Sequence, residues 1–228
     1  MIPKTKIEWA DYVWNPIWGC LKQPPCEYCY ARKIAKRFAD IKAKNEYAYC
    51  YNHRIFCQFL QIKDQLTQFR PTFLHSNFNE KFPQEPARIF VGSMSEIGFW
   101  EIEWTQKILK KIEDTLQHTF IFLTKFPRVY ERYHFPQNCW LGTTITYGER
   151  RDIILKRLKV PNLKFISFEP LLSQINIEDF FDDETLFPDW IIIGAQTNPW
   201  RPPRLEWIES IIEQCKRSRI PVFMKKNL

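Results

Sequence analysis

The sequence predicts an α/β protein, specifically a partial (β/α)6-7 TIM-like barrel with parallel strands. Six short runs are continuously apolar and rich in β-branched and aromatic residues, which is typical of strands buried on both faces of a parallel sheet. These runs are residues 89–92, 119–124, 139–144, 163–168, 190–194 and 221–224. A further strand is expected around residues 12–17. Alternation of strands with helices through short connections indicates six or seven β/α units.

The helices are expected where apolar residues recur on one face, because such stripes pack against a sheet. The stripes are Ala31, Ile34, Ala35 and Phe38; Trp104, Ile108, Ile112 and Leu116; Ile154 and Leu158; and Ile208, Ile212 and Cys215. Residues 45–88 interrupt the alternation and are aromatic and irregular. They are expected to form a helix followed by an insertion or long loop, within a single domain spanning residues 1–228.

A doubly wound sheet of the flavodoxin or Rossmann type is the alternative architecture. Six or seven units fit a barrel better, and the sequence contains neither a G-x-G-x-x-G nor a Walker sequence. The barrel is therefore the preferred prediction.

Composition restricts the class of protein. The chain of 228 residues has seven cysteines, an odd number, and its N-terminus has no secretory signal pattern. A disulfide scaffold is therefore not expected, whereas a reducing, cytoplasmic location is. Since no apolar run reaches the length of a membrane span, no membrane partner is expected. The net charge of +7 fits either an anionic partner such as nucleic acid or a solvated, lysine-rich surface.

Three cysteines near the N-terminus are the strongest chemical signal. Cys20, Cys26 and Cys29 have the spacing C-x5-C-x2-C, flanked by Pro and Gly residues. Three thiolates can hold an iron–sulfur cluster and leave one iron without a protein ligand. A structural zinc site is the alternative, but it usually needs four ligands in two pairs. A fourth ligand would then have to come from His53, Cys50 or Cys57.

The remaining cysteines have weaker interpretations. Cys50 and Cys57 are candidates for a second metal site, with His53 and His75 as the nearby additional ligands. Cys139 falls on a predicted strand and Cys215 on a helical stripe, so both are expected to be buried thiols.

Polar residues follow the predicted strands, at the edge where parallel α/β barrels place their active sites. The candidates are Ser93, Ser95 and Glu96, then Lys125, Thr144 and Glu169, and finally the loop residues Gln196, Asn198, Trp200 and Arg201. Structural alternatives remain for several of them. Ser95 is equally suited to a helix N-cap, Lys125 to solvation, and Glu169 to an ion pair with Arg201.

The cysteine segment resembles the cluster-binding loop of radical S-adenosylmethionine (SAM) enzymes, in particular the spore-photoproduct-lyase-like branch. The aromatic residue before the last cysteine, Tyr28, is typical of that loop, whose usual spacing is C-x3-C-x2-C. This chain has two more residues in the first interval, including Pro24 and Pro25. The whole chain also resembles the phage Gp37/Gp68-like proteins. That resemblance rests on residues 6–9, 14–16, 91–95, 123–125, 140–142, 167–172 and 214–215.

The resemblance implies a radical SAM enzyme. Cys20, Cys26 and Cys29 would hold a [4Fe–4S] cluster that reductively cleaves SAM to a 5′-deoxyadenosyl radical, which abstracts hydrogen from a substrate. It further implies that several residues bind SAM. The ammonium group of SAM would need hydroxyl or carboxylate acceptors among them. The residues concerned are Tyr28, Ser93, Ser95, Glu96, Lys125, Thr144 and Glu169.

The expected partners are a ferredoxin- or flavodoxin-like electron donor and a nucleic-acid or nucleoside substrate. Arg201 and Trp200 would suit an anionic aromatic ligand. Two alternatives stay open: a zinc-containing nucleic-acid-binding protein without catalysis, and a barrel that keeps the fold without SAM chemistry.

Overall fold

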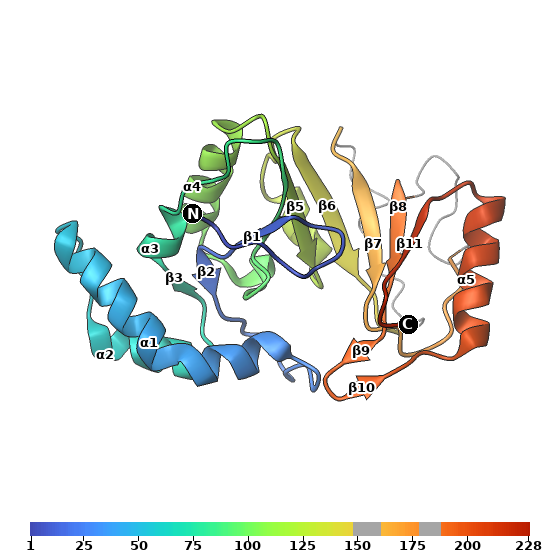
Figure 1. Cartoon of the computed structure of the whole chain (residues 1–228), viewed down its shortest axis with the longest axis horizontal. Coiled ribbons are helices and arrows are strands. Elements are labelled where there is room, and N and C mark those ends of the chain that lie inside the picture. The colour runs from blue at the N-terminus through green and yellow to red at the C-terminus, as the bar shows by residue number, and fades with distance from the viewer. Residues whose placement is uncertain (148–160, 178–187) are drawn as a thin grey trace. The chain divides into compact units, whose positions relative to one another are not determined.

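The computed structural model describes residues 1–147, 161–177 and 188–228 (Figure 1). It contains two compact units, Met1–Ile121 and Phe122–Leu228, and each is described by itself below. The predicted helix at Ile154 and Leu158 lies outside the described residues.

Seven parallel strands follow one another in the sheet in the order in which they occur in the chain. They are β1 (Tyr12–Trp14), β4 (Arg88–Val91), β5 (Thr119–Thr124), β6 (Cys139–Thr144), β7 (Lys164–Phe168), β8 (Trp190–Ile193) and β11 (Val222–Met224). The mixed α/β class with parallel strands is therefore confirmed. A doubly wound sheet reverses its strand order at a switch point, and the observed order has no reversal. The order thus favours the barrel over the doubly wound alternative.

In the first unit, β1 pairs in parallel with β4, with Trp14 opposite Val91. The small strands β2 (Ile17–Trp18) and β3 (Thr72–Phe73) form a separate antiparallel pair. The carboxyl end of β2 leads directly into the cysteine loop, and the carboxyl end of β4 leads into the segment that carries Ser93 and Ser95.

The helix α1 (Tyr30–Asn52) packs along α2 (Phe59–Thr67), as Figure 1 shows. Alanines at every fourth position form the buried face of α1, and Ile62 and Leu66 of α2 fill the space that these small side chains leave. The alanines are Ala31, Ala35, Ala39 and Ala43. The prediction that Ile34 and Phe38 are buried was wrong: the face that packs is the alanine face, so both larger side chains are exposed.

The segment 45–88 is more helical than expected. It contains the end of α1, all of α2, β3 and the short α3 (His75–Phe78). After β4 come the 3-10 turn η1 (Ile97–Phe99) and the helix α4 (Ile102–Glu113). Ile108 and Ile112 of α4 are buried as expected, but Leu116 is exposed because α4 ends at Glu113.

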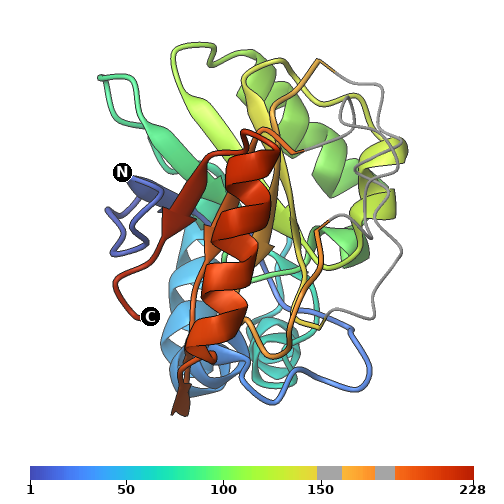
Figure 2. The same cartoon turned by 90° about the vertical axis from the view of Figure 1, so that its right-hand side faces the viewer.

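In the second unit, β6, β7, β8 and β11 are paired in parallel, and α5 (Leu205–Arg217) runs beside β11 (Figure 2). The buried face of α5 contains Ile211, Gln214 and Cys215, so the stripe is shifted by one residue from the expected Ile212. The Gln214 amide accepts a hydrogen bond from the Ile177 N–H at 2.6 Å and donates one to the Ile175 carbonyl at 3.2 Å. The unit also contains the 3-10 turn η2 (Pro127–Glu131) and the hairpin of β9 (Gln196–Thr197) and β10 (Trp200–Arg201).

The predicted buried thiols are confirmed. Cys139 on β6 and Cys215 on α5 are at most 1% exposed. Burial raises the pKa of both thiols, to about 12 for Cys215. No helix in the described part of the chain is long and apolar enough to cross a bilayer.

Candidate metal centres

The cysteine loop is anchored between two other segments of the first unit. The Gly19 N–H donates to the Met94 carbonyl at 3.0 Å, and the Cys20 N–H donates to the Phe69 carbonyl at 2.9 Å. Gly19 also forms a parallel β-bridge with Ser95. The first cysteine is therefore fixed next to the segment that follows β4.

Only glycine fits at position 19. Its φ is +115°, and a Cβ there would lie 2.1 Å from the Arg70 carbonyl oxygen. Both the backbone conformation and the close approach exclude a side chain. The residue before Cys20 thus sets the direction in which the loop leaves β2.

Backbone N–H groups donate to two of the three sulfur atoms. Cys29 is the N-cap of α1, and its Sγ accepts the Arg32 N–H at 3.4 Å. The Cys20 Sγ accepts the Lys22 N–H at 3.4 Å. The Cys29 N–H in turn donates to the Cys26 carbonyl at 3.1 Å, which closes a turn between these two residues. Such bonds, and the N-terminus of a helix, stabilise negative charge on sulfur.

The three cysteines lie close enough to influence one another electrostatically. The pKa of Cys20 is raised to about 11, mainly by burial and further by electrostatic interaction with Glu96, Cys29 and Cys26, although the bond from Lys22 opposes this. All three are half-buried free thiols. The structure therefore brings the predicted cysteines together and adds Glu96 to the group.

The chemistry of these donors is compatible with either kind of metal centre. Thiolates bind both zinc and iron–sulfur clusters, and the loop supplies three free thiols, one fewer than the four ligands of a usual structural zinc site.

Ser93, Ser95 and Glu96 lie beside this loop, after β4. The Ser93 hydroxyl donates to Asn15 Oδ1 at 3.0 Å, and the Ser95 hydroxyl accepts from the Trp100 indole N–H at 3.1 Å. The helix cap is Glu96, whose buried carboxylate accepts the Gly98 N–H at 3.2 Å, and not Ser95.

Tyrosines flank the last cysteine. Tyr28 is half-buried directly before Cys29. The Tyr30 hydroxyl donates to the Ser93 carbonyl at 2.8 Å and thereby ties the start of α1 to the segment after β4.

The other predicted site residues belong to the second unit. Lys125 is half-buried just after β5, and Thr144 is the buried last residue of β6. Glu169 follows β7 and forms an ion pair with Lys225. The alternative that Glu169 pairs with Arg201 was therefore wrong. Arg201 and Trp200 are exposed on the β9–β10 hairpin, where Arg201 is opposite Gln196.

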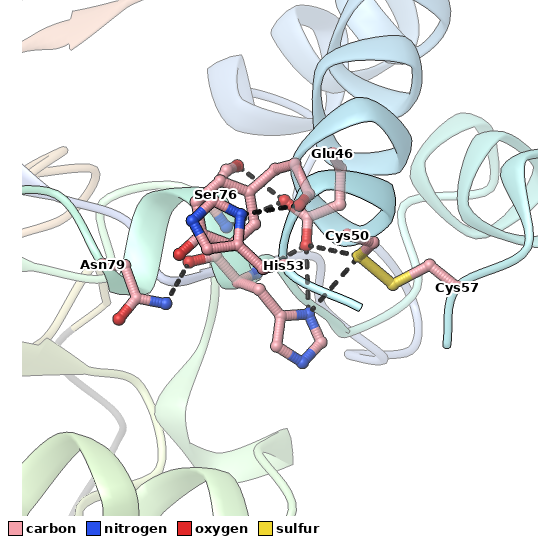
Figure 3. The surroundings of a disulfide bond; sticks show 8 residues. Glu46, Cys50, His53, Cys57, Ser76 and Asn79 are labelled. Atoms are coloured by element: carbon pink, nitrogen blue, oxygen red, sulfur yellow. Dashed lines mark hydrogen bonds and ion pairs between the residues drawn. A yellow bond between two sulfur atoms is a disulfide. The ribbon is translucent and has the colours of Figure 1, made fainter. Parts of the chain in front are cut away.

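A second group of potential ligands lies at the other end of α1 (Figure 3). Glu46, Cys50, Cys57 and His75 place their ligand atoms within 4.8 Å of one another. Cys50 and Cys57 are joined by a disulfide, although the sequence predicted them as candidates for a metal site. Of the predicted candidates, Cys50, Cys57 and His75 belong to this group and His53 does not, whereas Glu46 was not predicted. The available signal was its position four residues before Cys50, which places both on one helix face.

Comparison with known proteins identifies a family. The model of the family described as "Protein of unknown function (DUF5131)" matches residues 4–227. The chain belongs to this family. No curated protein and no solved structure matches it. The DUF5131 match includes both groups of cysteines, although the family description names no activity for either.

Proposed function

We propose that this DUF5131 chain is a radical SAM-type enzyme on a partial TIM-like barrel. Cys20, Cys26 and Cys29 hold a [4Fe–4S] cluster, which, when bound, supplies the electron that cleaves SAM to the radical that abstracts hydrogen from the substrate. The observation that carries the proposal is the group of three half-buried free thiols on one anchored loop, beside the buried carboxylate of Glu96.

The loop has the properties that a cluster needs from its protein. The N–H groups of Lys22 and Arg32 already donate to Cys20 and Cys29. Hydrogen bonds of this kind stabilise thiolate charge and adjust the reduction potential of a cluster. The apolar side chains that pack against these two sulfurs keep much of the water away. They are Ala31, Ala35, Phe69 and Met94.

The segment after β4 supplies acceptors suited to the SAM ammonium group. A carboxylate such as that of Glu96 has two oxygens with about four acceptor positions. The electrostatic influence of Glu96 on Cys20 supports its place next to the cluster. The hydroxyls of Ser93 and Ser95 are held in the same segment by Asn15 and Trp100.

The roles that we propose for residues of the second unit rest on the resemblance to radical SAM enzymes alone. Lys125 would bind the SAM carboxylate, Thr144 the ribose or carboxylate, and Glu169 the sugar hydroxyls or the substrate. The exposed Trp200 and Arg201 suit a nucleotide or nucleic-acid substrate. A ferredoxin- or flavodoxin-like protein would supply the electron.

The test is anaerobic reconstitution with iron and sulfide, followed by reduction in the presence of SAM. The wild-type chain should take up about four irons and release 5′-deoxyadenosine. Cys29→Ser removes one iron ligand but keeps an oxygen that can cap α1, so it should fold and lose both properties. Cys215→Ala, which removes a buried thiol of the second unit, is the matched control and should retain both.

Other results would contradict the proposal. If Cys29→Ser retained a full complement of iron, the loop would not be the cluster site. A loop that binds zinc and refuses iron would instead support the non-catalytic, nucleic-acid-binding alternative. Full iron uptake without any cleavage of SAM would support a barrel that lacks SAM chemistry.

A further inference from the structure

We propose that Glu46, Cys50, Cys57 and His75 form a second metal site, which binds one Zn²⁺ when the disulfide between Cys50 and Cys57 is reduced. This site is separate from the three-cysteine loop and does not depend on the function proposed for that loop. The disulfide is then the oxidised, metal-free state of the site.

The distances among the ligand atoms suit a single ion. The Cys50 Sγ lies 3.7 Å from Glu46 Oε1 and 4.0 Å from His75 Nδ1, and the two latter atoms are 3.1 Å apart (Figure 3). In a tetrahedron with the usual Zn–S, Zn–N and Zn–O bond lengths, the corresponding edges are about 3.3 to 3.7 Å. Three of the six distances between ligand atoms are thus close to the values expected with zinc bound, before any metal binds.

Three short segments of the first unit supply the ligands. Glu46 and Cys50 are one turn apart on the same face of α1. Cys57 comes just before Gln58, the N-cap of α2, and His75 is the first residue of α3. The Ile55 N–H donates to the Cys50 carbonyl at 2.8 Å, which fixes the return of the chain from α1 toward Cys57. Zinc binding requires the two sulfurs to separate to about 3.8 Å.

Glu46 is held in place as an ionised ligand. Its side chain is 1% exposed, and its carboxylate accepts the His75 N–H at 2.6 Å and the Ser76 N–H at 3.0 Å. Burial alone would raise the pKa of Glu46, but the hydrogen bonds from His75 and Ser76 outweigh it and leave the pKa below its usual value. A buried carboxylate beside two sulfurs and an imidazole is a favourable environment for a divalent cation.

The surrounding charge is compatible with zinc. Two thiolates and one carboxylate carry three negative charges, so the occupied site would carry one net negative charge. Lys42 lies one turn before Glu46 on α1. Burial lowers the pKa of Lys42, and attraction by Glu80 and Glu46 opposes this shift. The set of two sulfurs, one nitrogen and one oxygen is typical of Zn²⁺ rather than of Mg²⁺ or Ca²⁺.

The switch between the two states is a balanced two-electron reaction. A dithiol reductant donates two electrons and two protons to the Cys50–Cys57 bond and becomes a cyclic disulfide itself. The two new thiols then release their protons as they bind Zn²⁺ as thiolates. Oxidation reverses the sequence, because a disulfide sulfur has no negative charge to offer the metal.

The test uses the reduced, chelator-treated chain under anaerobic conditions. Titration with Co²⁺ should give a thiolate-to-cobalt charge-transfer band, which Zn²⁺ abolishes by displacement. Cys57→Ser and His75→Ala should each weaken Zn²⁺ binding by at least about 100-fold, since each removes a direct ligand. His53→Ala is the matched control, because the His53 ring stacks on Tyr49 and hydrogen-bonds its carbonyl at 2.9 Å.

A second measurement on the unaltered chain avoids dependence on variants that fold poorly. Zn²⁺ should protect Cys57 from alkylation in the reduced chain, and peptide mass spectrometry can distinguish Cys57 from Cys26 and Cys29. Treatment with a thiol oxidant should release one Zn²⁺ for each Cys50–Cys57 disulfide formed. Equal alkylation of Cys57 with and without Zn²⁺, or equal affinity in Cys57→Ser and wild type, would overturn the proposal.

Discussion

The two groups of cysteines in the first unit differ in what surrounds the sulfur atoms. Cys20, Cys26 and Cys29 lie on one loop, and backbone N–H groups donate to the sulfurs of Cys20 and Cys29. Cys50 and Cys57 come from the ends of two helices and flank a buried carboxylate and an imidazole. The first group consists of three free thiols, with the carboxylate of Glu96 as their electrostatic neighbour. The second has mixed ligands gathered around one point. Cysteine spacing alone does not distinguish them, whereas the neighbouring polar groups do.

The largest loss of unfolding free energy is expected from Gly19→Ala. This change should disrupt the three-cysteine loop but not the group that contains Cys50 and Cys57. A Cβ at this position collides with the Arg70 carbonyl and requires an unfavourable φ, so the free energy of unfolding should fall by about 3 kcal/mol or more. Iron uptake should fall with it, while Zn²⁺ affinity of the remaining folded protein stays unchanged. Urea denaturation and iron analysis measure the two effects. An unfolding free energy within about 0.5 kcal/mol of wild type would show that the loop can relax.

A smaller loss of unfolding free energy is expected from Glu46→Gln, which tests the group that contains Cys50, Cys57 and His75. Gln keeps the shape but loses the charge, and its amide NH₂ would face the N–H groups of His75 and Ser76. The loss of charge-assisted hydrogen bonds in a buried position should cost about 1.5 to 3 kcal/mol of unfolding free energy. The reduced variant should also bind Zn²⁺ more weakly, whereas iron uptake by the three-cysteine loop should not change. Wild-type stability in the metal-free state would argue against an ionised Glu46.

The smallest effect is expected from Asp11→Asn, an exposed counterpart to Glu46. Asp11 is bound by the Arg88 guanidinium and backbone N–H, and the Arg88 bonds lower the pKa of Asp11 despite partial burial. Because both side chains are more than 40% exposed, solvent screening limits the contribution to about 0.5 to 1 kcal/mol. The pKa is depressed on folding, so this contribution is present above pH 3.8 and disappears as the pH falls through the lower folded value. Urea denaturation of both proteins at pH 7 and pH 2.5 should show the difference shrink in acid, and a constant difference would contradict this.

The sheet could be predicted from the sequence because its strands are continuously apolar. Runs such as 119–124 and 190–194 need only burial on both faces to be recognised, and the structure places strands at both. The helices were predicted less well, because their buried faces depend on the partner. Ile34 and Phe38 look like core residues, but α1 packs through its alanines because α2 approaches it closely.

The candidate metal centres could also be predicted only in part, because some of their residues come together only through tertiary contacts. The three-cysteine loop is contiguous in sequence, so its ligands could be named from their spacing. The second group combines α1 with His75, which is 29 residues beyond Glu46 in the chain. Cys50, Cys57 and His75 could be named as reactive residue types. The helical spacing of Glu46 and Cys50 indicates that they share one face of α1, but the burial of Glu46 depends on tertiary contacts that the sequence does not show.

Helix α1 connects the two groups, since Cys29 caps its N-terminus and Cys50 lies in its last turn. At about 1.5 Å per residue, the two cysteines of a straight helix are about 30 Å apart. A cluster held by the loop would therefore lie too far from the disulfide for direct electron exchange, and each site would respond to its own reductant.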